Sequence, residues 1–289
     1  MAFKSGILLL LFVLAVNFSR AQAKVNLNDC IFKPEDQQIA HEKLSLFAAD
    51  KNLPIADLLV KIGLSFLGTP YVGATLENGP EEKMVVNLRE LDCTTFAENC
   101  LAFARTIKSG KTDFESFVAE LKYIRYRDGI CDKYPSRLHY FSEWIHNNAT
   151  KRTISEMPNL NGVKISKTIT FMSQHPESYP VLSSNPEMIP IIAQQEKKLS
   201  EKPFYYFPKT NPENLLKNLK HGDIIGLTAS EDATVDVNHV GIIVKKGNVL
   251  HVLHASLSGK MVILSDGPVT DFIKPESING GIVIARPVY

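Results

Sequence analysis

The sequence predicts an α+β fold in which helices come first and an antiparallel sheet follows. Between about residues 35 and 125, apolar residues recur at the spacing of amphipathic helices. After Asp223 they form short runs separated by turn residues such as Gly247 and Asn248, which is typical of strands and hairpins. Because helical and strand segments do not alternate along the chain, the pattern favours separate α and β parts.

Four helices are expected in the first part of the chain. Asp92 is a good N-cap residue for the third helix, and Gly68 and Gly110 are typical stop signals for the second and third. Residues 112–115 form a capping-box signature, which predicts the start of the fourth helix. The expected helices cover 35–50, 54–67, 93 to the stop at Gly110, and a segment that opens at 112–115.

The segment from about 126 to 211 has a looser pattern and is rich in prolines and aromatic residues. A long irregular stretch inside a compact domain usually has a function or is disordered, and the aromatic content argues against disorder. We therefore expect a central irregular or helical insertion that shapes the substrate site.

The last part of the chain is expected to form the antiparallel sheet. Its apolar runs are bounded by turn signals, and the two longest flank Gly247 and Asn248 as a hairpin. The expected strands cover residues 223–227, 237–244, 249–256, 261–264 and 281–287.

Residues 1–23 have the pattern of a secretory signal peptide. A short basic start precedes an apolar run from Gly6 to Phe18, and Ala21-Gln22-Ala23 matches a small-x-small cleavage site. The run is shorter than the roughly 20 residues of a membrane span, so no stable membrane anchor is expected. The sequence thus predicts an exported chain, periplasmic or secreted and cleaved near Ala23, with residues 24–289 as one domain.

Charge and cysteine content exclude some classes of partner. Without residues 1–23 the chain keeps 30 of its 32 basic side chains against 31 acidic ones, and it shows no basic patch, so nucleic acid is not expected as a partner. Cys93 and Cys100 lie two helical turns apart, too far for a disulfide. Cys100 is expected in the core, and the sequence leaves a Cys30–Cys131 disulfide open.

Cys93 is the candidate nucleophile. At the first turn of a helix it would lie among unpaired backbone N–H groups at the positive end of the helix dipole. Such an environment favours the thiolate, which is the reactive form of cysteine.

The C-terminal hairpin offers a base for this thiol. If the loop is centred between Lys246 and Gly247, His239 and His254 stand directly opposite each other on one sheet face, and His251 points to the other. His239 would then be the general base, and His254 would orient it. A turn at Gly247-Asn248 is the competing choice, and it would break the direct pairing.

Other hydrolytic chemistries find less support. No pair of histidines at helical spacing accompanies an acidic residue, so zinc is not expected. No G-x-S-x-G motif marks a serine nucleophile, and no glycine loop is suited to phosphate.

Several motifs together resemble the N-acetylmuramoyl-L-alanine amidase-like branch of the NlpC-type cell-wall hydrolases. The resemblance runs from about Gly63 to Pro287 and rests on several motifs in order. These are Gly68-Thr69-Pro70-Tyr71, Asp92-Cys93-Thr94-Thr95-Phe96-Ala97-Glu98, Ser136-Arg137-Leu138-His139-Tyr140-Phe141 followed by Trp144, His239-Val240-Gly241-Ile242 and His254-Ala255-Ser256.

The resemblance implies a papain-like core and cysteine-dependent hydrolysis of peptidoglycan or soluble muropeptides, without a metal or organic cofactor. The bond cut in this branch joins the lactyl group of muramic acid to L-alanine. The matching positions are Cys93 as nucleophile, His239 as base and His254 as third member, with the Tyr71 hydroxyl near the nucleophile.

Three residues of the central segment are expected to bind substrate. Arg137 would hold a stem-peptide carboxylate, and His139 and Trp144 lie beside it in the same motif, where an aromatic ring can stack on a sugar. Trp144 packing into the core is an equally weighted interpretation. Glu98 is expected either as an acceptor behind the site or as an exposed helix residue.

Three alternatives stay open on sequence alone. The same chemistry would serve an endopeptidase that cuts the γ-D-glutamyl-diaminopimelate bond, or an acyltransferase. A module that has kept the fold without catalysis would only bind the wall. Neither the oligomeric state nor the choice between intact wall and small fragments follows from the sequence.

Overall fold

The computed structural model describes residues 25–156, 162–230, 233–275 and 277–289. The expected secretory segment, residues 1–23, lies outside the described residues. The helices are α1 (Pro34–Phe47), α2 (Ile55–Leu64), α3 (Cys93–Lys108), α4 (Phe114–Arg125), α5 (Phe141–Thr150), α6 (Phe171–Gln174), α7 (Pro180–Ser184), α8 (Ile189–Ser200) and α9 (Pro212–Asn218). The strands are β1 (Cys30–Ile31), β2 (Met84–Val85), β3 (Ile154–Glu156), β4 (Val163–Ile165), β5 (Phe204–Pro208), β6 (Ile224–Thr228), β7 (Val237–Lys246), β8 (Val249–Ser256), β9 (Met261–Leu264) and β10 (Gly281–Pro287).

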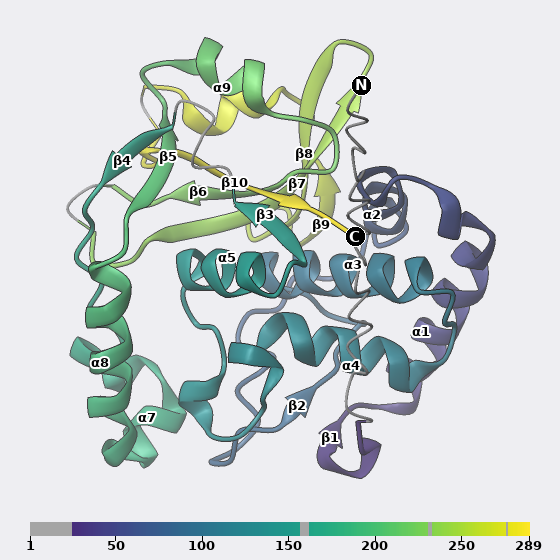
Figure 1. Ribbon diagram of the computed structural model, residues 1–289, viewed down its shortest axis with the longest axis horizontal. Coiled ribbons are helices and arrows are strands. Elements are labelled where there is room, and N and C mark those ends of the chain that lie inside the picture. The colour runs from purple at the N-terminus through teal and green to yellow at the C-terminus, as the bar shows by residue number, and fades with distance from the viewer. Residues whose placement is uncertain (1–24, 157–161, 231–232, 276) are drawn as a thin grey trace, which may run out of the picture.

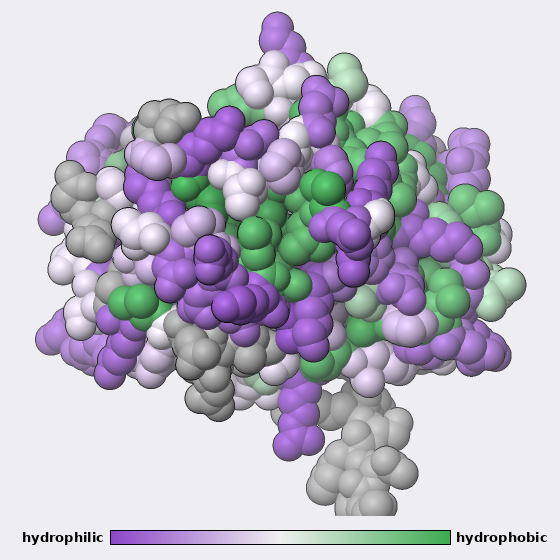
Figure 2. All heavy atoms as spheres, turned by 90° about the horizontal axis from the view of Figure 1, so that it is seen from above, coloured by the Kyte–Doolittle hydropathy of each residue, from purple (hydrophilic) through white to green (hydrophobic). Residues whose placement is uncertain are grey.

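The fold is α+β, as the sequence predicts. The main sheet is antiparallel, with the order β4-β5-β10-β6-β7-β8-β9, and β3 pairs with β10. The helices α1 to α5 lie on one side of the sheet, and α9 lies on the opposite side (Figure 1). Seen from that opposite side, polar side chains cover much of the surface, and apolar ones show between them in the middle (Figure 2). The described helices lack the length and apolar character of a membrane span.

Most expected elements appear at or near their predicted bounds. The helix α3 begins at Cys93, and Gly110 after it adopts a positive φ of 78°, as a stop signal should. The strands β8, β9 and β10 coincide with their predicted ranges. The start of α4 differs in detail, since Asp113, whose side chain accepts a hydrogen bond from the Ser116 backbone, is the N-cap instead of Thr112.

The helix α3 lies at the centre of the molecule and is buried along almost its whole length. It packs against α2 and α4 on its flanks and against β7 and β8 of the sheet. Apolar side chains from these elements form one continuous core, which includes Phe96, Phe103, Val240 and Leu253. This packing places the first turn of α3 beside the first residues of β7.

The central segment, residues 126–211, is more regular than expected. It contains α5, which joins the main core through Trp144 and Ile145, and the strands β3, β4 and β5, which extend the sheet. Its other helices, α6 to α8, surround a small core of their own. The many prolines suggested irregular structure, but several of them stand at helix starts, where a missing N–H breaks no hydrogen bond. These are Pro176, Pro180, Pro186 and Pro190.

A buried ion pair connects α3 to α4. Nε of Arg125 donates to Glu98 at 2.7 Å, both side chains are almost fully buried, and Nη1 of Arg125 donates to the Val85 carbonyl at 2.6 Å. Glu98 is therefore neither an exposed helix residue nor an acceptor behind the site. Burial raises the pKa of the Glu98 carboxyl, and the Arg125 guanidinium opposes that rise.

Replacing Arg125 by methionine is expected to lower the free energy of unfolding by about 3–5 kcal/mol, because it leaves the Glu98 carboxylate buried without a partner. The double variant Arg125→Met/Glu98→Leu should lose less than the single variant. Lys61→Met, which breaks an exposed pair with Asp50, should cost under about 1 kcal/mol. Urea denaturation measures all three, and a double variant as unstable as Arg125→Met would contradict the interpretation.

Candidate active site

The first turn of α3 presents Cys93 through a reciprocal cap. Oδ1 of Asp92 accepts a hydrogen bond from the Thr95 backbone at 2.7 Å, and the Thr95 hydroxyl accepts one from the Asp92 backbone at 2.9 Å. This confirms Asp92 as the N-cap and fixes Cys93 at the first helical position. The backbone N–H of a residue at that position has no partner within the helix and is free to bind a ligand.

Tyr71 is held beside this helix start by backbone hydrogen bonds. Its own N–H donates to the Lys260 carbonyl at 2.9 Å, and the N–H of Leu91 donates to the Pro70 carbonyl at 3.0 Å. Burial, with added contributions from Cys93 and Asp92, raises the pKa of the Tyr71 hydroxyl to about 12. The hydroxyl therefore keeps its proton near neutral pH and is available as a donor next to Cys93.

His239 and His254 form a hydrogen-bonded pair. Nε2 of His239 lies 2.7 Å from Nδ1 of His254, and the two rings are almost perpendicular. The third ring in contact is that of Phe272, which packs edge-on to His254. The prediction that these two histidines share one sheet face is confirmed, and His251 instead hydrogen-bonds to the Ser265 carbonyl.

The predicted direct opposition of the two histidines is wrong. The hairpin turns at Gly247 and Asn248, so that Lys246 pairs with Val249 and the register is shifted by two residues from the expected one. A shift of two keeps every side chain on its own face, so the histidines meet diagonally. Gly241 lies between the two strands where a Cβ would come within 2.5 Å of Cγ1 of Val252, so the close packing of β7 on β8 at this point needs a glycine.

A β-bulge precedes His239 in β7. In the pairing with β6, His239 lies opposite Leu227 and Val237 lies opposite Thr228, which leaves Asn238 as the extra residue. Bulges are common beside active sites, where they redirect side chains. The side chain of Asn238 is exposed and lines the same pocket as His239.

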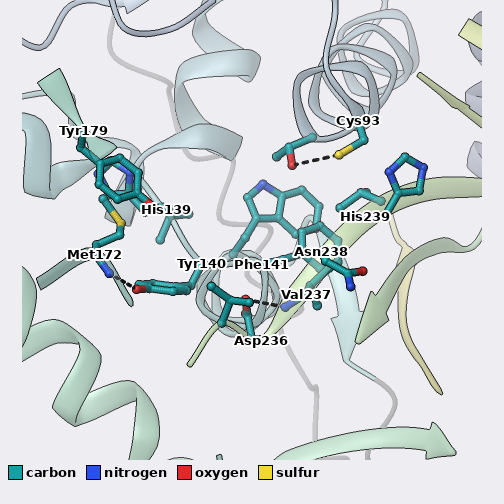
Figure 3. Close-up of a pocket in the computed structure, with 15 residues that line it drawn as sticks. Cys93, His139, Tyr140, Phe141, Met172, Tyr179, Asp236, Val237, Asn238 and His239 are labelled. Atoms are coloured by element: carbon teal, nitrogen blue, oxygen red, sulfur yellow. Dashed lines mark hydrogen bonds between the residues drawn. The ribbon is translucent and has the colours of Figure 1, made fainter. Parts of the chain in front are cut away.

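A pocket of about 230 Å³ lies between the first turn of α3, the start of β7 and the central segment. Cys93 and His239 lie on one side of it, and His139, Met172 and Tyr179 lie on the other (Figure 3). Its remaining lining residues are Thr94, Leu138, Tyr140, Phe141, Trp144, Val235, Asp236, Val237, Asn238 and Val240. Aromatic rings from the central segment therefore face the cysteine–histidine side across the pocket.

Cys93 and His239 are both neutral in this arrangement. Burial and the Asp92 carboxylate raise the pKa of the Cys93 thiol to about 11, and the nearby backbone N–H of Val240 opposes the rise. Burial lowers the pKa of His239 to about 4. Within the described part of the chain no hydrogen bond joins Sγ of Cys93 to His239. The expectation that the helix start favours the thiolate is wrong here, because burial and the Asp92 carboxylate favour the neutral thiol.

Alkylation of Cys93 by iodoacetamide is therefore expected to accelerate about tenfold per pH unit from pH 7 to pH 10, because the thiolate fraction grows in that proportion below a pKa of about 11. Site-resolved mass spectrometry measures the rate separately for Cys93 and for Cys30, which is also free and half-buried. A Cys93 rate that is already constant at pH 7 would instead indicate a preformed thiolate–imidazolium pair.

Arg137 is not free to bind a carboxylate. Its side chain is buried, with Nη2 donating to Glu77 at 2.6 Å and Nε lying 3.5 Å from Glu82. It does not line the pocket, and it fixes the loop between Tyr71 and β2 to the chain before α5. Of the predicted site residues, four line the pocket and three do not: Cys93, His139, Trp144 and His239 line it, and Tyr71, Arg137 and His254 lie outside its lining.

His139 and Trp144 do line the pocket. The His139 ring stacks on Tyr134, and its Nε2 lies 2.9 Å from the Tyr134 carbonyl. Trp144 is 1% exposed and stacks on Phe141, with ring centroids 5.1 Å apart. Trp144 therefore packs into the core, as one of its two interpretations expected, and it also borders the pocket.

Sequence reasoning missed several pocket residues. Asp236 is buried and accepts hydrogen bonds from the backbone N–H groups of Ser142 and Val237, so it ties the start of β7 to the start of α5. Tyr179 and Met172 come from the helical part of the central segment. No local signal marks them, although the aromatic content of that segment points to it as a whole. The described residues contain no cluster of three or more potential metal ligands.

Comparison with known families now identifies the chain. Residues 61–282 match the sequence model of a family described as N-acetylmuramoyl-L-alanine amidase-like. The chain belongs to this family. Membership places it among amidase-like hydrolases and agrees with the family resemblance seen in the sequence motifs.

Solved structures support this placement of the amidase-like chain. An N-acetylmuramoyl-L-alanine amidase from Bacteroides uniformis is 33% identical with a TM-score of 0.75, covering 81% of this chain and 99% of its own. A Bacteroides fragilis protein named as a candidate xylanase is 37% identical with a TM-score of 0.72, and the match covers 78% of this chain and 98% of that protein. A Legionella pneumophila protein shares the fold at 18% identity and a TM-score of 0.65, and the match covers 88% of this chain and 96% of that protein. No curated protein matches the sequence.

Proposed function

We propose that the chain is a cysteine amidase that hydrolyses the amide between N-acetylmuramic acid, or its anhydro form, and L-alanine in peptidoglycan fragments. The observation that carries the proposal is that Cys93 and His239 line one pocket, with His254 hydrogen-bonded to His239 and Tyr71 held beside the start of α3. The amidase-like family gives the class of bond. The helix α3 packed on the antiparallel sheet supports a papain-like core of the NlpC type.

The pairing of the histidines determines which nitrogen acts as the base. Because Nε2 of His239 is engaged with His254, only Nδ1 of His239 remains to take the thiol proton. Nδ1 must then be unprotonated in the resting enzyme, so Nε2 carries the proton and donates it to Nδ1 of His254. His254 in this role orients His239 and stabilises the imidazolium that forms.

The proposed reaction proceeds in two steps. Nδ1 of His239 takes the Cys93 proton as Sγ attacks the lactyl carbonyl carbon, and the oxyanion that forms accepts hydrogen bonds from the Tyr71 hydroxyl and the Cys93 N–H. The C–N bond then breaks, and His239 gives its proton to the departing nitrogen of L-alanine. In the second step His239 takes a proton from water, whose oxygen displaces Sγ from the thioester, and the thiol is restored.

The pocket supports small fragments over intact wall as the substrate. It is bordered on one side by the central segment, which we propose shapes the substrate site, and its volume suits one end of a muropeptide. Such a substrate fits an exported chain, and we propose residues 1–23 as the export signal. Asp236 is the one carboxylate among the lining residues, so the pocket lacks the carboxylate pair that xylan hydrolysis needs.

Product analysis tests the proposed bond. The chain incubated with a purified disaccharide–tetrapeptide is expected to release a disaccharide and an intact stem peptide, identified by mass spectrometry. Release of diaminopimelyl-D-alanine, with L-alanyl-D-glutamate still attached to the disaccharide, would show the endopeptidase instead, and product formed only with an added amine would show an acyltransferase. Binding of the disaccharide–tetrapeptide without release of any product would show a wall-binding module. Efficient solubilisation of intact sacculi would contradict the preference for fragments.

A further inference from the structure

Trp144 has one polar atom, and that atom has no partner. It is the single tryptophan of the chain, and Nε1 of its indole is buried without a hydrogen-bond partner among the described residues. A buried N–H of this kind is costly unless something accepts from it. One face of the ring is occupied by Phe141, at an interplanar angle of 9°. With 1% of its surface exposed, the ring is not a platform for a sugar, and the unpaired N–H is its one polar group at the border of the pocket.

His139 offers the complementary group. A carbonyl oxygen can only accept, so the 2.9 Å contact with the Tyr134 carbonyl places the proton of the neutral ring on Nε2. Nδ1 of His139 is then a bare acceptor, with no partner in the described part of the chain. Burial and the charge of Arg137 lower the pKa of His139 far below its usual range, so the ring stays neutral and Nδ1 stays an acceptor.

Part of the pocket lining beside these two residues is apolar. Leu138 and Met172 line the pocket together with the rings of Tyr140 and Phe141. His139 lies across the pocket from Cys93 (Figure 3), so a group bound there would be part of the same substrate but would not be the scissile bond. The pocket thus offers the Trp144 N–H as a donor and Nδ1 of His139 as an acceptor, together with apolar side chains.

We propose that this part of the pocket binds a secondary amide of the substrate, whose carbonyl oxygen accepts from Nε1 of Trp144 and whose N–H donates to Nδ1 of His139. The inference rests on the proposed function. Muropeptides carry such a group in two places: the acetamido group of the amino sugar, whose methyl would contact the apolar walls, and the backbone amides of the stem peptide.

Fluorescence of the single tryptophan tests the binding without turnover. In Cys93→Ala, we expect saturating N-acetylmuramic acid or L-alanyl-D-isoglutamine to shift the Trp144 emission, whereas muramic acid without its acetyl group should not. A shift with the sugar identifies the acetamido group, and a shift with the dipeptide identifies the stem peptide. No shift with either probe, or an equal shift with muramic acid, would overturn the inference.

Substitutions test the two atoms separately. Replacing Trp144 by benzothienylalanine keeps the ring and removes only the N–H, and His139→Phe keeps the stacking on Tyr134 and removes the acceptor. Both should raise KM for the muropeptide at least tenfold with kcat changed less than threefold. His175→Phe is a matched control, because His175 stacks on Phe171 at the same 40° angle outside the pocket.

These outcomes separate the inference from the proposed function. Unchanged KM in both variants, with normal hydrolysis by the unmodified chain, would overturn the amide site alone. A fluorescence shift with N-acetylmuramic acid in a chain that releases no product would keep the amide site and contradict the proposed hydrolysis.

Discussion

Replacing Cys93 by alanine is expected to lower kcat/KM for muropeptide hydrolysis by at least about 10⁴-fold, because the His239–His254 pair then has no nucleophile to activate. Cys93→Ser should lose nearly as much kcat/KM, since His239 would then have to deprotonate a hydroxyl, which is far less acidic than a thiol. Release of the stem peptide, followed by chromatography and mass spectrometry, measures the loss. Thermal unfolding is the control that checks whether both variants remain folded.

Cys100→Ala is the matched control for this experiment. Cys100 lies on the same helix, is fully buried in the main core and does not line the pocket. Its replacement is expected to reduce stability through a small cavity and to leave kcat/KM within about threefold of the original. If Cys93→Ala retained turnover, Cys93 would not be the nucleophile, and the proposed mechanism would be wrong.

Local signals explain why the fold could be predicted well. The start of α3 depends on Asp92 and its neighbours within three residues, and the ranges of β9 and β10 follow from short apolar runs between turn residues. The helix and strand periods are properties of the sequence itself, so no distant contact is needed to find them. The order of these elements then gives the α+β class.

The hairpin shows how a wrong register still gave the right pair of histidines. The turn falls at Gly247, whose φ of 59° suits glycine, and Asn248, and not one residue earlier. Moving the turn by one residue shifts the register by two, which preserves the face of every side chain. The sequence therefore predicts which histidines share a face, but the diagonal contact depends on the register that the turn at Gly247 and Asn248 sets.

Long-range partners explain what the sequence could not predict. Arg137 looks like a free cation in sequence, but Glu77, which occupies it, lies 60 positions away. Glu98 likewise finds Arg125 only after α3 and α4 have packed. The same packing buries the Cys93 thiol and raises its pKa, so a rule based on the helix start alone fails.

His239→Gln is expected to lower kcat by about 10²–10⁴-fold, the usual contribution of a general base. The loss should lie toward the upper end of this range because the Cys93 thiol, with a pKa of about 11, supplies little thiolate without a base. With the unmodified chain, kcat/KM should fall as pH drops toward about 4, because protonated His239 cannot accept the thiol proton. Initial rates across pH 4 to 8 measure this, and a rate that rises toward low pH would contradict the role of His239.

His254 separates orientation of the base from simple packing. His254→Asn retains an oxygen that can accept from Nε2 of His239, whereas His254→Phe retains a ring against Phe272 but no acceptor. We expect kcat to fall less than tenfold in the asparagine variant and about 10²-fold or more in the phenylalanine variant. A smaller loss in the phenylalanine variant than in the asparagine variant would mean that His254 only fills space. A loss confined to His254→Phe would show that His254 acts through its hydrogen bond to His239, and that this bond sets the tautomer of His239.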